Sequence, residues 1–154
     1  MAGITDGDTF TSVLAQQPDV HRPLAALNAA AWSVVDPVLL ELCRLRIATL
    51  LGCNVEQRLR TDAALAAGLD EATVAELAAW PTSERFGPLE RACLAFCEQF
   101  VIDVASMSDE LAFAVSDELG PEGFRNFVSG LLVVEQRQRL RLAWECLLEP
   151  MTDR

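Results

Sequence analysis

Proline and glycine stand where helices begin and end, and this punctuation constrains the fold more than any other feature of the sequence. Asp36-Pro37 places a capping side chain before proline at the first helical position, and Gly52 ends the same apolar segment. Gly120-Pro121 opens the last and longest helix. No window alternates apolar and polar residues between hairpin turns, so the sequence predicts no strand. We therefore expect an all-α bundle of seven or eight helices.

The helical spacing gives approximate bounds for these elements. Residues 1–20 are polar and are expected to form an N-terminal arm with one short helix, and residues 21–150 are expected to form one helical domain. The linker at 80–87 leaves too few helices on either side for two separate cores. The expected helices are 10–16, 22–34, 37–50, 54–68, 71–79, 88–104, 109–119 and 122–148.

Composition limits the class of protein. A chain of 154 residues, 51% of them hydrophobic, can bury about 70% of its unfolded surface in a single domain. Its 12 basic and 23 acidic residues give a net charge of −11, which argues against nucleic acid or an anionic membrane as a partner. Five cysteines without framework spacing fit a reducing compartment. The sequence predicts no signal peptide and no spanning helix, so we expect a cytoplasmic protein.

The segment from Gly52 to Arg60 combines residue types that carry chemistry. Gly52 leads directly into Cys53, which places the thiol near a helix N-terminus, where partial positive charge favours the thiolate. Glu56 and Arg60 follow on roughly the same helical face. The same residues also fit a structural role, because an acid in the first turn and a Glu-to-Arg pair four residues apart both stabilise a helix. The residues alone leave both interpretations open.

The stretch from Glu41 to Arg60, with the segment 63–69 after it, resembles the carboxymuconolactone decarboxylase and alkylhydroperoxidase D superfamily. The order of helices extends this resemblance over roughly residues 20–148 and implies an alkylhydroperoxidase D-like fold. In the peroxidase branch the pattern is a glutamate, then Cys-x-x-Cys, then x-x-x-His. The resemblance assigns Glu41 to the proton-relay glutamate and Cys53 to the first cysteine.

The departures from that pattern fall on the reactive positions. Glu56 stands where the peroxide-attacking second cysteine would be, so no local dithiol can cycle to a disulfide. Arg60 stands at the histidine, and arginine stays protonated and cannot shuttle protons. Other relatives, including the decarboxylase branch, have Glu-x-x-x-His here, so Glu56 agrees with that pattern while Arg60 departs. The sequence therefore predicts a degenerate active site.

The remaining cysteines and the single histidine carry weaker signals. Cys93 and Cys97 lie one turn apart on an apolar helix, and Cys43 and Cys146 also neighbour apolar positions, so we interpret all four as small core residues. His21 lies close to the N-terminal arm and is expected at the surface. With one histidine and scattered thiols, the sequence predicts neither a metal site nor a bound cofactor.

Several arginines stand near the motif. Arg46, in the helix before the cysteine, and Arg137, in the last helix, resemble positions that the family often occupies with basic residues. One interpretation is a set of ion pairs with nearby acids, which also suits Arg44, Arg139 and Arg141. The other is an anion clamp beside the cysteine site, suited to a small molecule that carries a carboxylate. Arg60 would orient such an anion as well.

The resemblance also implies assembly as a trimer or hexamer, with helices packed between subunits. The last helix carries more apolar residues than a thin bundle needs, which permits such packing. These residues are Phe124, Phe127, Val128, Leu131 and Leu132. We therefore expect a homo-oligomer.

Three functions remain open from the sequence. The first is a carboxymuconolactone decarboxylase-like enzyme with a small-molecule pocket, in which Glu41 and Glu56 are the acid/base catalysts and Cys53 is a nucleophile or a pocket wall. Arg60, Arg46 and Arg137 would bind its substrate. The second is a single-cysteine peroxidase resolved by an external thiol. The third is a non-catalytic oligomer that serves as a binding or interaction module.

Overall fold

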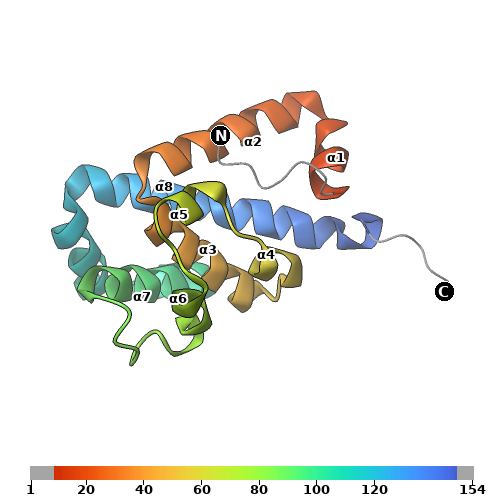
Figure 1. Ribbon diagram of the computed structural model, residues 1–154. Helices are drawn as coiled ribbons and strands as arrows, with labels where there is room; N and C mark the ends of the chain where they lie inside the picture. Colours follow the sequence, from red (N-terminus) through yellow and green to blue (C-terminus); the bar gives the residue numbers. More distant parts are fainter. Residues whose placement is uncertain (1–8, 149–154) are drawn as a thin grey trace.

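The protein is a bundle of helices, as the sequence predicts (Figure 1). The computed structural model describes residues 9–148, with side chains for residues 10–144. No strand occurs in this part of the chain. The α-helices are α1 (Thr9–Ala15), α2 (Pro18–Val34), α3 (Pro37–Leu51), α4 (Asn54–Arg58), α5 (Asp62–Ala66), α6 (Glu71–Ala75), α7 (Pro88–Asp103) and α8 (Asp109–Leu148), and the 3₁₀ turns are η1 (Leu77–Ala79) and η2 (Val104–Ser106).

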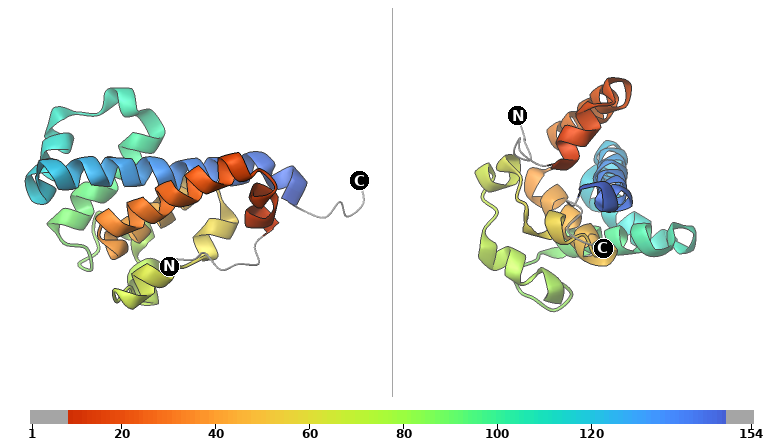
Figure 2. Two further views of the ribbon diagram at one scale, coloured as in Figure 1. Left: turned by 90° about the horizontal axis from the view of Figure 1, so that it is seen from above. Right: turned by 90° about the vertical axis from the view of Figure 1, so that its right-hand side faces the viewer.

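Helix α3 is the central element of the bundle. It packs against α7 and against α8, while α2 runs along α8 (Figures 1 and 2). The short elements α4, α5 and η1 also contact α3. The core between the long helices is apolar, and its fully buried side chains include Leu40, Ile47, Leu94, Phe127 and Leu131.

The predicted boundaries of α3 are confirmed in atomic detail. The carboxylate of Asp36 accepts a hydrogen bond from the Leu39 backbone N–H at 2.9 Å, and Pro37 occupies the first turn. Gly52 ends the helix with φ 71° and ψ 25°, a left-handed conformation that favours glycine. These caps place the chain reversal that brings α4 back beside α3.

The prediction of one helix over residues 54–68 is wrong. The chain leaves α4 at Leu59, which is extended with ψ 150°, and a second short helix begins after Thr61. The Thr61 hydroxyl accepts a hydrogen bond from the Ala64 backbone N–H at 3.4 Å and so caps α5. Local spacing favours one helix here, but the extended segment is fixed by contacts to α3.

One further helix boundary differs from the prediction, and another agrees with it. Helix α2 begins at Pro18 rather than near residue 22, because proline is well placed in a first helical turn. The two helices expected on either side of Gly120 are both present within α8, and they meet without a loop at a break where Gly120 is non-helical, with φ 71° and ψ 168°. The predicted break at Gly120 is therefore confirmed.

Most of the apolar residues expected at subunit contacts pack within the protomer. Phe127 and Leu131 are fully buried, Phe124 and Val128 are partly buried against the core, and only Leu132 is exposed, at 46%. The prediction of an apolar excess on this helix is therefore wrong for four of its five residues. Among the described residues, none of the helices combines the length and the apolar character that crossing a bilayer requires.

Candidate functional site

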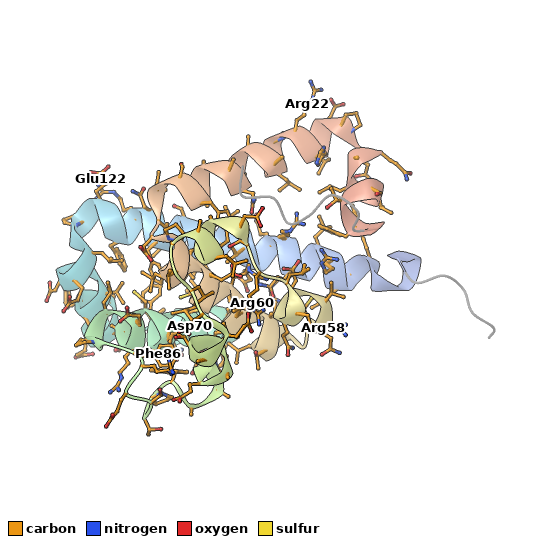
Figure 3. The ribbon with its side chains drawn as sticks, in the orientation of Figure 1. Arg22, Arg58, Arg60, Asp70, Phe86 and Glu122 are labelled. Atoms are coloured by element: carbon orange, nitrogen blue, oxygen red, sulfur yellow. The ribbon has the colours of Figure 1, made fainter. Side chains whose placement is uncertain are left out.

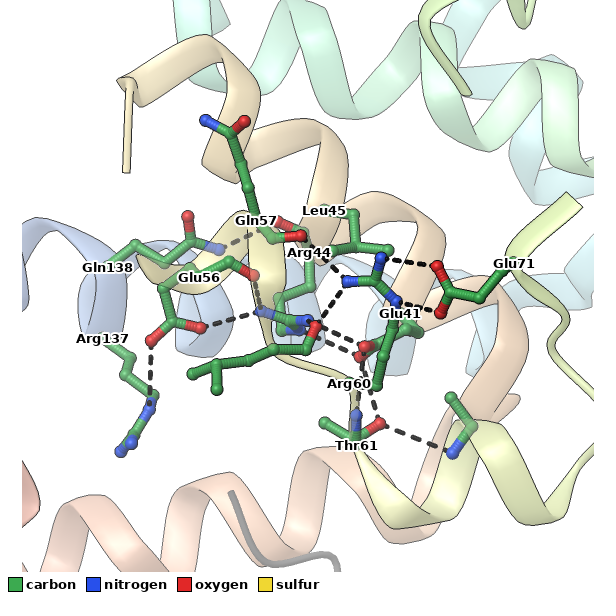
Figure 4. Close-up of polar contacts among 12 residues, drawn as sticks. Glu41, Arg44, Leu45, Glu56, Gln57, Arg60, Thr61, Glu71, Arg137 and Gln138 are labelled. Atoms are coloured by element: carbon green, nitrogen blue, oxygen red, sulfur yellow. Dashed lines mark hydrogen bonds and ion pairs between the residues drawn. The ribbon is translucent and has the colours of Figure 1, made fainter. Parts of the chain in front are cut away.

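The reversal at Gly52 and Cys53 brings two predicted acids to one point. The Cys53 backbone N–H donates to the Ala48 carbonyl at 2.8 Å, and α4 then runs back beside α3. Glu41 on α3 and Glu56 on α4 both direct their carboxylates at the guanidinium of Arg44 (Figure 4). Both carboxylates and this guanidinium are buried, with at most 2% of each residue exposed.

Arg44 uses its full set of hydrogen-bond donors. Its Nε and Nη2 donate to the two Glu41 carboxylate oxygens at 2.9 and 2.7 Å, and its Nη1 donates to Glu56 Oε2 at 2.8 Å. The two remaining N–H groups donate to the backbone carbonyls of Glu56 at 3.0 Å and Leu59 at 2.8 Å. Burial alone would lower the pKa of Arg44, but the hydrogen bonds and charges of Glu41 and Glu56 outweigh it and raise the pKa above its ordinary value.

The carboxylate of Glu41 is equally well satisfied. The Thr61 backbone N–H donates to Glu41 Oε1 at 3.1 Å and the Thr61 hydroxyl donates to Oε2 at 3.0 Å. With the two bonds from Arg44, this carboxylate accepts four hydrogen bonds. Both of its oxygens are therefore occupied by α3 itself and by the turn that begins α5.

The last helix closes the other side of the site. Arg141 Nε donates to Glu56 Oε1 at 2.9 Å, and Arg137 Nε forms a longer ion pair with the same oxygen at 3.8 Å. The ring of Phe10, from α1, lies 4.6 Å from the Arg141 guanidinium and 4.9 Å from that of Arg137. We call Glu41, Arg44, Glu56, Arg137 and Arg141 the ion-pair cluster.

A buried amide lies behind the ion-pair cluster. The Gln138 Nε2 donates to the Arg44 carbonyl at 2.9 Å and ties α8 to α3, and Gln138 is fully buried. Sequence reasoning missed Gln138, Thr61 and Phe10. Of these three, only Thr61 could have been found from the local sequence, because threonine is a favoured residue at the N-cap of a helix.

A model of the carboxymuconolactone decarboxylase family matches residues 18–99, which is more than half of the chain and runs from α2 into α7. The chain belongs to this family. No curated protein and no solved structure matched it. The matched region contains Glu41, Arg44 and Glu56, whereas Arg137 and Arg141 come from the last helix beyond it.

Two of the arginines expected at the site of this family member do not pair with its carboxylates. Arg60 forms an ion pair with Glu71 at 2.8 Å and also donates to the backbone carbonyls of Gln57 and Leu59 (Figure 4). The Leu59 carbonyl also accepts from Arg44, so Arg60 lies beside the ion-pair cluster without contacting Glu41 or Glu56. Arg46 pairs with Glu98 of α7 at 2.6 Å. Of the three arginines predicted to bind substrate, the structure brings only Arg137 to Glu56.

The cysteines occupy two different settings. Cys53 is 1% exposed and precedes the first residue of α4. Cys43, Cys93 and Cys97 are fully buried between α3 and α7, which confirms their interpretation as core residues. A hydrogen bond with Cys97 and burial hold the pKa of Cys43 well above its ordinary value, and burial, helped by Glu90, raises the pKa of Cys93 to about 12.

The Cys146 side chain lies outside the described residues. Among those that are described, no three histidine, cysteine or acidic side chains are grouped so that they could hold a metal ion.

Two small hollows on the described part of the surface lie away from this site, and neither is lined by the ion-pair cluster or by Cys53. One, of about 180 Å³, lies where α3 and α4 face α6 and η1. The other, of about 290 Å³, lies where the end of α2 and the start of α3 face α7 and α8. The second is lined by Val34, Val35, Asp36, Leu39, Leu89, Glu90, Leu119, Gly123 and Phe127.

Proposed function

We propose that this family member is a non-catalytic binding module, in which the ion-pair cluster fastens α3, α4 and α8 together rather than transferring protons. The observation that carries the proposal is the saturation of Arg44, whose five donors are all taken by oxygens of Glu41, Glu56 and Leu59. A group that binds a substrate needs donors or acceptors that remain available to it.

Acid/base catalysis fits this arrangement poorly. A general base must reach the proton that it removes by a hydrogen bond of ordinary length. Glu41 accepts four hydrogen bonds and is fully buried, so it would have to give up one of these bonds before contacting a substrate. Glu56 is likewise fully buried between Arg44 and Arg141.

Thiol chemistry has a similar difficulty. A nucleophilic cysteine must be accessible to its substrate, and Cys53 is 1% exposed. The position of the attacking cysteine in the peroxidase branch holds Glu56, whose carboxylate is bound to Arg44 and Arg141. A single-cysteine peroxidase would therefore have to open the site before the thiol could react.

Assembly as a homo-oligomer, implied by the family resemblance, remains part of this proposal. Helix α2 supports it, because Val20, Leu27 and Val34 recur every seven residues and are 45%, 51% and 53% exposed. A seven-residue apolar repeat suits packing against another helix. Light scattering of the purified chain tests this part, since a monomer at micromolar concentration would contradict it.

Turnover measurements test the function. Native protein, Cys53→Ser and Glu56→Gln are assayed for peroxide consumption with a general thiol reductant and for decarboxylation of carboxymuconolactone. We expect none of the three to exceed the rate without protein. Turnover in the native chain that disappears in Cys53→Ser would instead support the single-cysteine peroxidase, and loss confined to a Glu56→Gln variant with an unchanged circular dichroism spectrum would support acid/base catalysis.

Alkylation provides a second readout. The folded protein is treated briefly with an alkylating agent across a pH series and digested for mass spectrometry. Because Cys53 is as buried as Cys43, Cys93 and Cys97, we expect all four to be modified only as the protein unfolds. Selective modification of Cys53 in the folded state would argue for a retained thiol site.

A further inference from the structure

The smaller hollow is lined by one partly exposed cation, two polar side chains and an apolar wall. It lies where α3 and α4 face α6 and η1, on residues that the ion-pair cluster does not use. Its lining residues are Leu45, Arg46, Thr49, Gln57, Val74, Ala75, Leu77 and Ala78.

Arg46 is held in place but is not saturated. Its Nε donates to Glu98 Oε1 at 2.6 Å, and the same oxygen accepts a bond from Trp80 Nε1 at 2.7 Å, which fixes the carboxylate. Within residues 10–144, no hydrogen bond is made by the two terminal nitrogens of Arg46. A guanidinium has five donors, so four donors of Arg46, a lining residue of the hollow, make no hydrogen bond within residues 10–144. The side chain is 19% exposed.

The rest of the lining is amphipathic. Leu45, Val74 and Leu77 supply an apolar wall, and Leu77 is 6% exposed. Gln57 donates through Nε2 to the Ala48 carbonyl at 3.2 Å, which leaves its carboxamide oxygen as an acceptor. A few placed polar groups over an apolar wall are the usual composition of a small-molecule site.

We propose that this hollow binds a small monocarboxylate, with the carboxylate on the terminal nitrogens of Arg46 and the apolar body against Leu45, Val74 and Leu77. This inference rests on the proposed function, since it names the ligand class of the binding module. At about 180 Å³ the hollow is smaller than the roughly 300 Å³ at which sites for drug-sized ligands begin, so only a compact ligand fits.

Ligand binding here does not require the ion-pair cluster to rearrange. Arg44 and Arg46 are two residues apart on α3, and positions two apart face different sides of a helix. Glu56 and Gln57 on α4 diverge in the same way, the first toward Arg44 and the second toward the hollow. The two faces of the α3–α4 corner therefore hold separate features.

The test titrates ¹⁵N-labelled full-length protein with sodium benzoate and, separately, with benzamide, its uncharged isostere. We expect saturable shifts of the backbone amides that line the hollow and a dissociation constant on the order of 1 mM for benzoate, as suits a small ligand in a shallow site. Benzamide should bind about tenfold more weakly or worse, because it lacks the charge that Arg46 recognises.

Variants separate this site from general attraction of an anion. Arg46→Met should weaken benzoate binding about tenfold or more. Arg58→Met is the matched control, because it removes the same charge from an exposed residue of α4 outside the hollow, and it should leave binding unchanged (Figure 3). Ala78→Leu fills the hollow without removing a charge and should abolish binding of both compounds, which keeps the test decisive if Arg46→Met folds poorly.

Several outcomes overturn the inference. Shifts that map away from the hollow, equal affinity for benzoate and benzamide, or full binding by Ala78→Leu would each contradict it. The turnover assays are independent of this titration. Turnover in the absence of binding at the hollow would overturn both proposals, whereas absent turnover with no binding at the hollow would overturn this one alone.

Discussion

Two arginines on α3, two residues apart, have opposite surroundings. Arg44 is 2% exposed and donates all of its hydrogen bonds to protein oxygens, whereas Arg46 is partly exposed and donates to one carboxylate. Within one helix of one chain, the difference comes from what packs on each face. Charge alone therefore does not mark a binding residue, and the donors that remain after folding are the better guide.

The strongest challenge to this comparison is to remove each arginine in turn. Arg44→Met leaves two carboxylates buried without their shared cation and should lower the free energy of unfolding by about 3–5 kcal/mol. Arg46→Met breaks a partly exposed pair and should cost about 1 kcal/mol or less. Urea denaturation followed by circular dichroism measures both. Equal losses would mean that the two faces of α3 do not differ as described.

Removing Phe10, whose ring lies over two arginines of the ion-pair cluster, should have the next largest effect on stability. Phe10→Ala removes a fully buried ring from Arg137 and Arg141 and should cost about 3 kcal/mol, at the lower end for such truncations because α1 is short. Phe113→Ala is the control, since Phe113 is 62% exposed and its loss should be nearly neutral. A neutral Phe10→Ala would show that α1 adds nothing to the ion-pair cluster.

The hydroxyls of Thr61 and Thr49 allow the two faces of α3 to be compared through the loss of a single group. Thr61→Val removes a donor to Glu41 and the cap of α5 together and should destabilise the protein by about 1–2 kcal/mol. Thr49→Val, beside the hollow, removes an exposed hydroxyl that bonds only within α3 and should cost less than about 0.5 kcal/mol. If the two changes are equivalent in thermal denaturation, the bond from Thr61 to Glu41 has no energetic weight.

The thiols between α3 and α7 should have the smallest effect on stability. They are buried as neutral groups, in contrast to the charged groups of the ion-pair cluster. The folded pKa values of Cys43 and Cys93 lie above the ordinary value of 9.0, so the folded state holds their protons more tightly than the unfolded state does. Their tighter proton binding adds to the free energy of unfolding. This stabilisation is fully present below pH 9 and is lost as the pH rises toward about 12.

The sequence contains neither lysine nor tyrosine, so neither of these side chains titrates in the same pH range as the thiols. We expect unfolding midpoints in urea to fall between pH 9 and pH 11, and to fall less in Cys93→Ala. A midpoint that does not change over this range would contradict the burial of protonated thiols.

Local signals in the sequence predicted the fold well, and contacts between distant residues explain where it failed. Asp36-Pro37, Gly52 and Gly120 set boundaries through their own backbone preferences, and the structure places turns or bends at each. The break after α4 could not be found this way. It depends on Thr61 donating to Glu41, a residue 20 positions earlier.

The candidate site followed the same division. The family pattern singled out Glu41 and Glu56, and both meet in one cluster. Arg44 is three residues from Glu41, a spacing that favours pairing on a helix, whereas Arg46 is five residues away and faces another side. The contact of Arg44 with Glu56, twelve positions later, could not be predicted from this local spacing. Arg141 was expected to form an ion pair with an acid, but its partner Glu56 lies 85 positions away and could not be identified from the sequence.

Arg44 also constrains the path of the backbone between α4 and α5. Two of its five donors meet backbone carbonyls, those of Glu56 and Leu59, rather than side chains. Apolar contacts are non-directional, whereas a buried guanidinium disfavours any arrangement that leaves one of its donors without an acceptor. The position of the connection between α4 and α5 is thereby encoded in one side chain of α3. We expect other backbone conformations of this connection to be excluded from the native ensemble because they would leave Arg44 donors without acceptors, rather than because of steric clashes.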